Sequence, residues 1–230
     1  ARRLRPGDVL RIDGAPELCP RVISREGGTA LLDFGPDEQA LADALDRAGE
    51  IPLPPYITRP EGPSAGDRAD YQTVFAARPG AVAAPTASLH VTPAMLDRFA
   101  ARGIGRIALT LHVGAGTFLP VRAEDPREHR IHAEWGEVTP EAANAFNAAR
   151  REGRRIVALG TTALRLLETA CDAEGALQPF RGLTEIFLLP GHRFRGADLL
   201  LTNFHLPRST LLMLACAFAG TGPVMDAYAH

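Results

Sequence analysis

The sequence predicts a layered α/β domain that follows a small β-rich unit. Strand-like and helix-like segments alternate from residue 71 to the end of the 230-residue chain, which is typical of layered α/β domains. Residues 1–50 instead hold short β-type runs separated by glycine-containing turns. Hydrophobic residues make up 46% of the chain and charged residues 23%, proportions that support a folded core and exclude a disordered chain.

The N-terminal unit is predicted from its turns and one helix. Its β-type runs are Val9–Ile12, Arg21–Ile23 and Thr29–Phe34. The segment Asp37–Ala48 is rich in Ala and Leu and stops before Gly49, which predicts a helix with a glycine C-cap. A proline-rich connector at residues 51–56 then separates two domains, residues 1–50 and residues 51–230.

The larger domain is predicted from alternating strands and helices. The strand-like runs are Arg106–Val113, Arg155–Leu159, Thr184–Leu189 and Leu199–Thr202. The helix-like runs are Pro93–Arg102, Pro140–Glu152, Thr162–Ala173 and Ser209–Phe218. Two helices begin with a threonine N-cap followed by proline, at Thr92 and Thr139, and end at Gly103 and Gly153.

Polar and glycine residues gather where three of these strands end. The loops concerned are Gly114–Phe118, Gly160–Thr162 and Asn203–Thr210. Ligands of α/β domains usually bind at the carboxyl ends of strands. We therefore expect the three loops to follow strands of one sheet and to form one site.

Each loop also has a purely structural interpretation. The Gly114 loop lacks the third glycine of a dinucleotide fingerprint and fits a tight turn equally well. The loop at Gly160 either offers backbone N–H groups to an anion or caps a helix. Ser209 or Thr210 either joins the site or caps the last helix, but capping leaves the neighbouring Asn203, His205 and Arg208 unexplained.

His129, His132 and Glu134 are candidate ligands of a zinc ion. The alternation of apolar and polar residues over 131–135 instead predicts a strand, in which His129 and His132 face opposite sides. We therefore predict no metal site and expect one of these residues to act in polar recognition or proton transfer.

All 25 basic residues are arginine, which excludes Schiff-base chemistry and a P-loop lysine. The net charge of −2 gives no global field for a polyanion, yet residues 71–230 carry 16 arginines against 14 acidic residues. An RNA partner is therefore not excluded, and its cationic contacts must come from Arg, an N-terminal amine or charged His. The Arg150–Arg155 cluster is either a solvated helix end or a phosphate contact.

Neither a membrane anchor nor an export signal is indicated. The longest apolar run, residues 211–219, is shorter than the roughly 20 residues that span a bilayer, and residues 1–5 lack an apolar signal core. The distant Cys19, Cys171 and Cys216 predict neither a disulfide framework nor a thiolate metal site. A soluble cytoplasmic protein is expected.

Four blocks of sequence carry a specific pattern: Tyr71–Phe75, Ala84–His90, Thr110–Val121 and Asn203–Leu214. They closely resemble the S-adenosylmethionine:tRNA ribosyltransferase-isomerase (QueA) family of queuosine biosynthesis, and blocks at residues 129–134, 160–168 and 190–191 follow in the family's order. The resemblance covers about 160 residues from Tyr71 on. Because family members extend beyond both ends of the chain, it implies an α/β catalytic domain with a β-barrel domain only partly present.

The resemblance implies a reaction on tRNA. The ribosyl part of S-adenosylmethionine is transferred to a 7-aminomethyl-7-deazaguanine (preQ1) wobble base and isomerised, which gives epoxyqueuosine-tRNA and releases adenine and methionine. S-adenosylmethionine is thus a consumed substrate, and no cofactor is implied. The partners are preQ1-containing tRNA and S-adenosylmethionine, with no membrane, and the protein is expected to be a monomer.

This chemistry implies roles for the clustered residues. The sulfonium acidifies the neighbouring carbon, so a histidine suffices as base, and His90, His112 and His205 are equal candidates. Negative charge on the opening ribose would be met by Arg208 and by backbone N–H groups of Gly114, Gly116 and Thr117. Asn203 or Thr86 would donate to the departing adenine, and Glu134 or Glu168 would attract the sulfonium. The remaining predicted substrate-binding residues are Phe118, His132, Gly160, Thr161, Thr162, Arg165, Ser209 and Thr210.

Three other functions compete with this interpretation. A conventional methyltransferase predicts a glycine-rich loop after a strand and a ribose-binding acid downstream, an arrangement that the sequence does not show. A metal hydrolase would rest on His129, His132 and Glu134, and metal analysis of the protein discriminates it. A non-catalytic tRNA-binding module would release no adenine.

Overall fold

The computed structural model describes residues 4–26, 29–54, 56–64, 66–114, 125–129 and 131–229. It divides into two compact units, Ala1–Ile51 and Pro52–His230. Both combine strands with helices, which confirms the mixed α/β class. That the first unit belongs to a β-barrel domain stays a prediction.

The first unit holds a β-hairpin and one helix. Strands β1 (Arg21–Glu26) and β2 (Thr29–Asp33) pair antiparallel, and α1 (Glu38–Ala48) follows them. As a helix N-cap does, Asp37 accepts a hydrogen bond from the backbone N–H of Ala40, at 2.9 Å. The strand predicted at residues 9–12 is wrong, because this segment makes only isolated bridges at its two ends.

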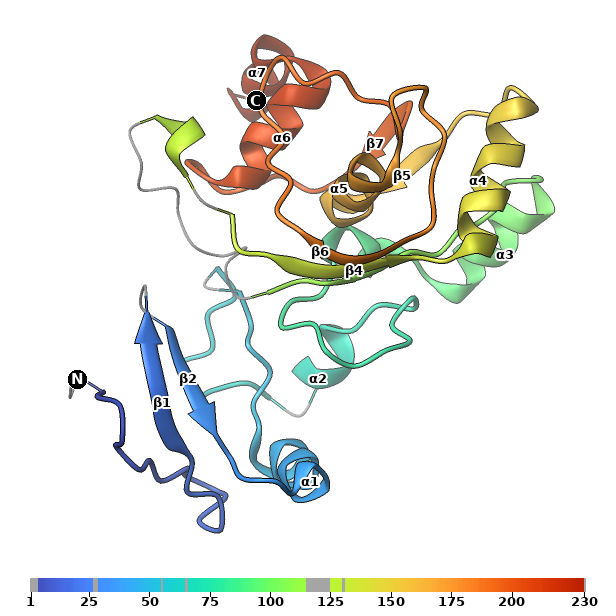
Figure 1. The fold of residues 1–230 in the computed structure, drawn as a ribbon. Coiled ribbons are helices and arrows are strands. Elements are labelled where there is room, and N and C mark those ends of the chain that lie inside the picture. The colour runs from blue at the N-terminus through green and yellow to red at the C-terminus, as the bar shows by residue number, and fades with distance from the viewer. Residues whose placement is uncertain are drawn as a thin grey trace. The chain divides into compact units, whose positions relative to one another are not determined.

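The strands that the structure describes in the second unit form two small sheets (Figure 1). An antiparallel sheet has the order β3 (Thr110–His112), β4 (Glu134–Val138) and β6 (Phe180–Thr184). A parallel pair consists of β5 (Val157–Leu159) and β7 (Leu199–Leu201). The carboxyl ends of β5 and β7 therefore meet at one edge, whereas β3 ends in the other sheet. The expectation that all three loops follow strands of one sheet is wrong, because β3 pairs with β4.

Helices surround these sheets. They are α2 (Asp67–Asp70), α3 (Pro93–Ala101), α4 (Pro140–Arg151), α5 (Gly160–Ala170), α6 (Thr210–Ala219) and α7 (Thr221–Ala229), with the 3₁₀ turns η1 (Thr86–His90) and η3 (Pro126–Glu128). The predicted N-caps of α3 and α4 are confirmed, since Thr92 and Thr139 accept hydrogen bonds from the backbone N–H groups of Met95 and Ala142. The ends of these two helices also lie within one residue of the prediction.

Helix α5 lies at the centre of the larger unit's core (Figure 1). It packs against strands of both sheets and against η1 and α6. Leu164 and Leu166 are fully buried, and Phe146 of α4 is 1% exposed. A Cβ on Gly136 of β4 would lie 2.7 Å from Leu166 Cδ1, so a larger residue would force this buried leucine to move.

One predicted strand of this unit is misplaced. The apolar run Thr184–Leu189 was expected to be a strand, but β6 ends at Thr184 and begins at Phe180. Leu188 is nevertheless buried in the core, at 2% exposure. An apolar run indicates burial, whereas pairing with β4 decides which residues are extended.

The two C-terminal helices are apolar and short. Among the described residues, no single helix has the length and composition of a membrane span. Helices α6 and α7 reach that length only together, as a pair bent by 116°.

Candidate functional site

Two segments far apart in the sequence meet at His90. This residue ends η1, and its Nε2 lies 2.8 Å from Oδ1 of Asn203, which follows β7. Because an amide oxygen accepts, Nε2 carries the proton in this contact and Nδ1 keeps a lone pair when the ring is neutral. Two of the candidate residues are thus joined by a direct hydrogen bond.

The N-terminus of α5 borders the same region. Gly160 follows β5 directly with φ of +86°, a conformation that favours glycine. A Cβ on Gly160 would lie 3.6 Å from Ala87 Cβ of η1. Gly160 and Thr161 are buried, whereas the neighbouring Thr162 is half-buried. The parallel pair β5–β7 therefore brings two of the three predicted loops beside η1.

His205 is held on both its ring and its backbone. Its Nε2 lies 3.2 Å from Thr202 Oγ1, and its backbone N–H donates to the hydroxyl of Tyr228. Burial lowers the pKa of His205 below its ordinary value, so the ring is neutral near pH 7. A neutral imidazole in this position is able to accept a proton.

A cavity of about 300 Å³ lies between the end of β7 and helices α6 and α7. Its walls are mainly apolar, and the rings of Phe204 and Tyr228 meet edge to face at 4.8 Å. Thr202 and Asn203 supply the polar groups of the lining. Apolar walls with a few polar groups are typical of small-molecule sites. The cavity adjoins the contact between Asn203 and His90.

The turn before α6 combines a helix cap with an unusual backbone. Ser209 accepts a hydrogen bond from the N–H of Leu212 at 3.1 Å and donates to the carbonyl of Leu206 at 2.7 Å. This cap explains Ser209, and Thr210 is the first helical residue. Arg208 has φ of +57°, a conformation that costs a non-glycine residue on the order of 1 kcal/mol or more, and its side chain is exposed.

A buried ion pair joins β4 to α5. Arg165 Nη1 donates to Glu134 Oε2 at 2.5 Å, and the two residues are 7% and 4% exposed. The N–H of Gly114, after β3, donates to the other oxygen of Glu134 at 3.0 Å. Glu134 therefore fixes the start of the Gly114 loop on the core of the domain.

Glu168 holds a different loop. Its carboxylate accepts hydrogen bonds from the backbone N–H groups of Arg195 and Gly196, at 3.0 and 2.6 Å, and lies 2.8 Å from His192 Nε2. These contacts give Glu168 a structural role on the 192–196 segment. Its contact with a substrate stays a prediction.

His112 lies on the antiparallel sheet, away from the contacts of His90 and His205. Its ring centroid is 5.1 Å from that of Trp135 in β4. A Cβ on Gly80 would lie 2.5 Å from His112 Nδ1, so this ring is packed beneath a glycine. No hydrogen bond or ring contact between described residues joins His112 to the other two histidines.

The three residues considered as metal ligands do not gather. His129 meets the ring of Phe187 edge to face, His132 is exposed, and Glu134 is paired with Arg165. Within the described part of the chain, no three His, Cys, Asp or Glu side chains are placed to hold a metal ion. The predicted residues Gly116, Thr117 and Phe118 lie outside the described residues.

Two tyrosines that no sequence pattern singles out contact predicted site residues. Tyr228 of α7 binds the backbone of His205, and Tyr56 shares a hydrogen bond with the side chain of Thr86. Neither tyrosine lies in a loop that follows a strand, and such loops are where the sequence predicts the site residues. Only the tertiary structure brings them to the site.

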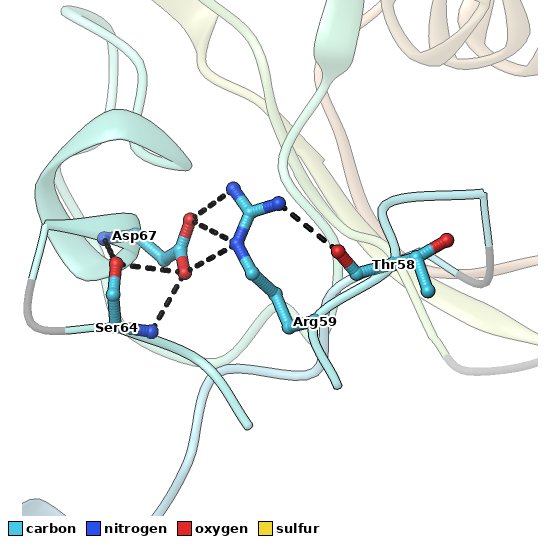
Figure 2. Close-up of polar contacts among 4 residues, drawn as sticks. All are labelled: Thr58, Arg59, Ser64 and Asp67. Carbon is cyan, nitrogen blue, oxygen red and sulfur yellow. Dashed lines mark hydrogen bonds and ion pairs between the residues drawn. The ribbon is translucent and has the colours of Figure 1, made fainter. Parts of the chain in front are cut away.

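The segment after Tyr56 is fixed by a buried carboxylate (Figure 2). Asp67 is 5% exposed and accepts hydrogen bonds from Arg59 Nη2 at 2.7 Å and from the N–H of Ser64 at 2.7 Å. The bonds from Arg59, and then that from Ser64, hold the pKa of the Asp67 carboxyl well below its ordinary value. Within the polar loop predicted at residues 58–70, Arg59 and Ser64 are therefore bonded to Asp67, and Asp67–Asp70 form helix α2.

Replacing Asp67 by asparagine is expected to lower the melting temperature by several degrees at pH 7. Because the folded-state pKa lies below the unfolded value of about 4, the charged carboxylate stabilises the fold above that pH, and the contribution disappears as the pH falls. The variant should therefore lose less stability than the parent between pH 7 and pH 3. Thermal unfolding measures this, with the exposed Asp97→Asn as control. Equal effects of both substitutions would contradict the assignment.

Comparisons with known proteins agree with one another. A family model described as queuosine biosynthesis protein matches residues 1–230. S-adenosylmethionine:tRNA ribosyltransferase-isomerases of Gluconacetobacter diazotrophicus and Methylocella silvestris are each 57% identical over the whole chain, which spans 65% and 64% of their lengths. The crystal structure of S-adenosylmethionine tRNA ribosyltransferase from Thermotoga maritima matches 99% of this chain at 30% identity and a TM-score of 0.51, over 60% of its own length. The chain thus spans somewhat less than two thirds of the length of each of these relatives.

Proposed function

The chain belongs to the queuosine biosynthesis protein family, and we propose that it carries out the reaction for which its relatives are named. The ribosyl part of S-adenosylmethionine is transferred to the preQ1 wobble base of tRNA and isomerised, and adenine and methionine leave. S-adenosylmethionine is consumed, and no cofactor takes part. We further propose that the protein acts as a cytoplasmic monomer on its tRNA.

The observation that carries the proposal is the His90–Asn203 contact beside an apolar cavity. The reaction needs a base for the carbon next to the sulfonium, and a neutral histidine is suited to this at pH 7. With Nε2 bonded to Asn203, the Nδ1 lone pair of His90 is the one available for the proton. We assign the base to His90 and its orientation to Asn203.

The volume and lining of the cavity support a planar base as its occupant. A volume of about 300 Å³ exceeds what a purine needs, and the edge-to-face pair Phe204–Tyr228 supplies an aromatic wall. Asn203 and Thr202 line the cavity, and their amide and hydroxyl groups are of the kind that hydrogen-bond to ring nitrogens. We propose that this cavity takes the adenine of S-adenosylmethionine, and that Asn203 donates to it as it leaves.

The remaining candidates act at the edges of this site. Arg208 on its left-handed turn meets negative charge that develops on the ribose oxygen. The backbone N–H of Gly114 is bonded to Glu134, so it does not take part. His205 contributes as a second, buried imidazole held by Thr202. The carboxylates of Glu134 and Glu168 already have partners, so they act on the sulfonium only through the local field.

Release of adenine tests the proposed function. The intact protein is incubated with S-adenosylmethionine and preQ1-containing tRNA, and the small-molecule products are separated by chromatography. We expect adenine with preQ1-containing tRNA and none with the same tRNA carrying guanine at the wobble position. S-adenosylhomocysteine in place of adenine would indicate a methyltransferase and overturn the proposal.

A further inference from the structure

An arginine-rich recess lies at the other end of α5 from the candidate site. Its volume is about 540 Å³, and it is formed by the C-terminal end of α4, the turn after α5 and the segment around residue 194. Four arginines line it, namely Arg150, Arg151, Arg193 and Arg195, against a single acidic side chain, Glu174.

One of the four arginines, Arg150, stabilises the wall of the recess and is not available to bind a ligand. Arg150 donates to Asp198 at 2.8 Å and to the carbonyl of Arg195 at 2.9 Å, and it lies over the ring of Phe146. Its charge is therefore balanced by Asp198. Arg150 fastens the 195–198 segment to helix α4.

The other three guanidinium groups remain open to solvent. Arg151, Arg193 and Arg195 are exposed, and within the described ranges none of them forms an ion pair with a carboxylate. Glu174 supplies one negative charge, so the lining keeps a net positive charge. A concave surface of this kind concentrates anions.

The backbone that carries these groups is held in place. Glu168 accepts hydrogen bonds from the N–H groups of Arg195 and Gly196, and Asp172 accepts them from Glu174 and Ala176. A Cβ on Gly196 would lie 2.7 Å from Leu167 Cβ, so the segment is pressed closely onto α5. The open guanidinium groups thus project from a preorganised frame, which lowers the entropic cost of binding.

We propose that this recess binds phosphate groups of the RNA backbone through Arg151, Arg193 and Arg195. Guanidinium groups match phosphate oxygens in bidentate geometry, and in a chain without lysine they are the main cationic groups available. Helix α5 has 11 residues, about 16 Å at 1.5 Å per residue, and separates the recess from Gly160. This inference rests on the proposed function, in which the RNA is a tRNA. The recess then holds a part of the tRNA backbone that is remote from the reacting base. Such phosphate contacts position an RNA without reading its sequence.

The double variant Arg151→Ala/Arg193→Ala tests the recess. Its affinity for a fluorescently labelled hairpin RNA with the anticodon stem and loop is measured by anisotropy at several salt concentrations. We expect binding to weaken by about tenfold at 0.1 M salt and the slope of log K against log salt to decrease by about two. The control Arg98→Ala/Arg102→Ala removes the same charge from exposed positions at the end of α3 and should leave both values nearly unchanged.

A charge-preserving variant separates binding from folding. Arg151→Lys/Arg193→Lys keeps the charge without the bidentate geometry and should recover part of the affinity. The melting temperature should be the same for all variants, because both side chains are exposed. Equal RNA affinity of the recess and control variants would overturn the inference. Because anisotropy needs no turnover, RNA binding at the recess without adenine release would refute the proposed function and leave the recess standing.

Discussion

Replacing His90 by alanine is expected to slow adenine release by about 10²- to 10⁴-fold, the range by which a positioned general base accelerates proton transfer. His90 is an exposed residue at the end of a 3₁₀ turn and is bonded to Asn203, so its loss should leave the melting temperature almost unchanged. Turnover at saturating S-adenosylmethionine and tRNA gives kcat, and thermal unfolding gives the stability.

The other histidines provide the comparison for His90. His129→Ala removes an imidazole that contacts Phe187 and should leave turnover near that of the parent. His112→Ala removes a ring packed between Gly80 and Trp135 and should act on stability more than on kcat. A His90→Ala variant with turnover close to the parent's, or a loss in kcat as large for His112→Ala, would show that the base is assigned wrongly.

Replacing Glu134 by alanine is expected to destabilise the fold by about 3–5 kcal/mol, because it leaves the buried Arg165 guanidinium without a counter-charge. Two further nitrogens of Arg165, Nε and Nη2, are buried without a hydrogen-bond partner among the residues that the structure describes, so none of these compensates for the loss of Glu134. Urea unfolding of the intact protein measures the change in free energy.

The same strand offers a matched control. Glu137 of β4 pairs with Arg78 and Arg181, whose side chains are exposed, and Glu137→Ala should cost at most about 1 kcal/mol. The double variant Glu134→Leu/Arg165→Met removes both buried charges and should recover much of the stability. A similar loss for Glu134→Ala and Glu137→Ala would contradict the view that burial makes the Glu134–Arg165 pair critical.

Local chemistry made part of this fold predictable. The Thr-Pro starts of α3 and α4 follow from side-chain capping and the fixed φ of proline, which depend on adjacent residues only. The strand expected at Thr184–Leu189 was misplaced because pairing with β4 defines strand β6. In that pairing Leu183 lies opposite Trp135, which is 48 residues earlier in the chain. Sequence patterns indicate burial there but do not reveal the partner.

The candidate site was likewise predictable from the sequence only in part. Its loops were found because polar residues cluster after β5 and β7, and parallel pairing then brings those loops to one edge. The partners of the site residues were not predictable, because contacts such as Asn203 with His90 and His205 with Tyr228 span 113 and 23 residues. The third loop belongs to another sheet, since β3 pairs with β4.

Transfer of the ribosyl group into tRNA tests the central claim most directly. The intact protein is given preQ1-containing tRNA with S-adenosylmethionine labelled either in the ribose carbons or in the methyl group. We predict that ribose label enters the RNA in a one-to-one ratio with released adenine, and that methyl label stays in solution as methionine. Methyl label in the RNA, with the ribose label left in solution, would contradict the account.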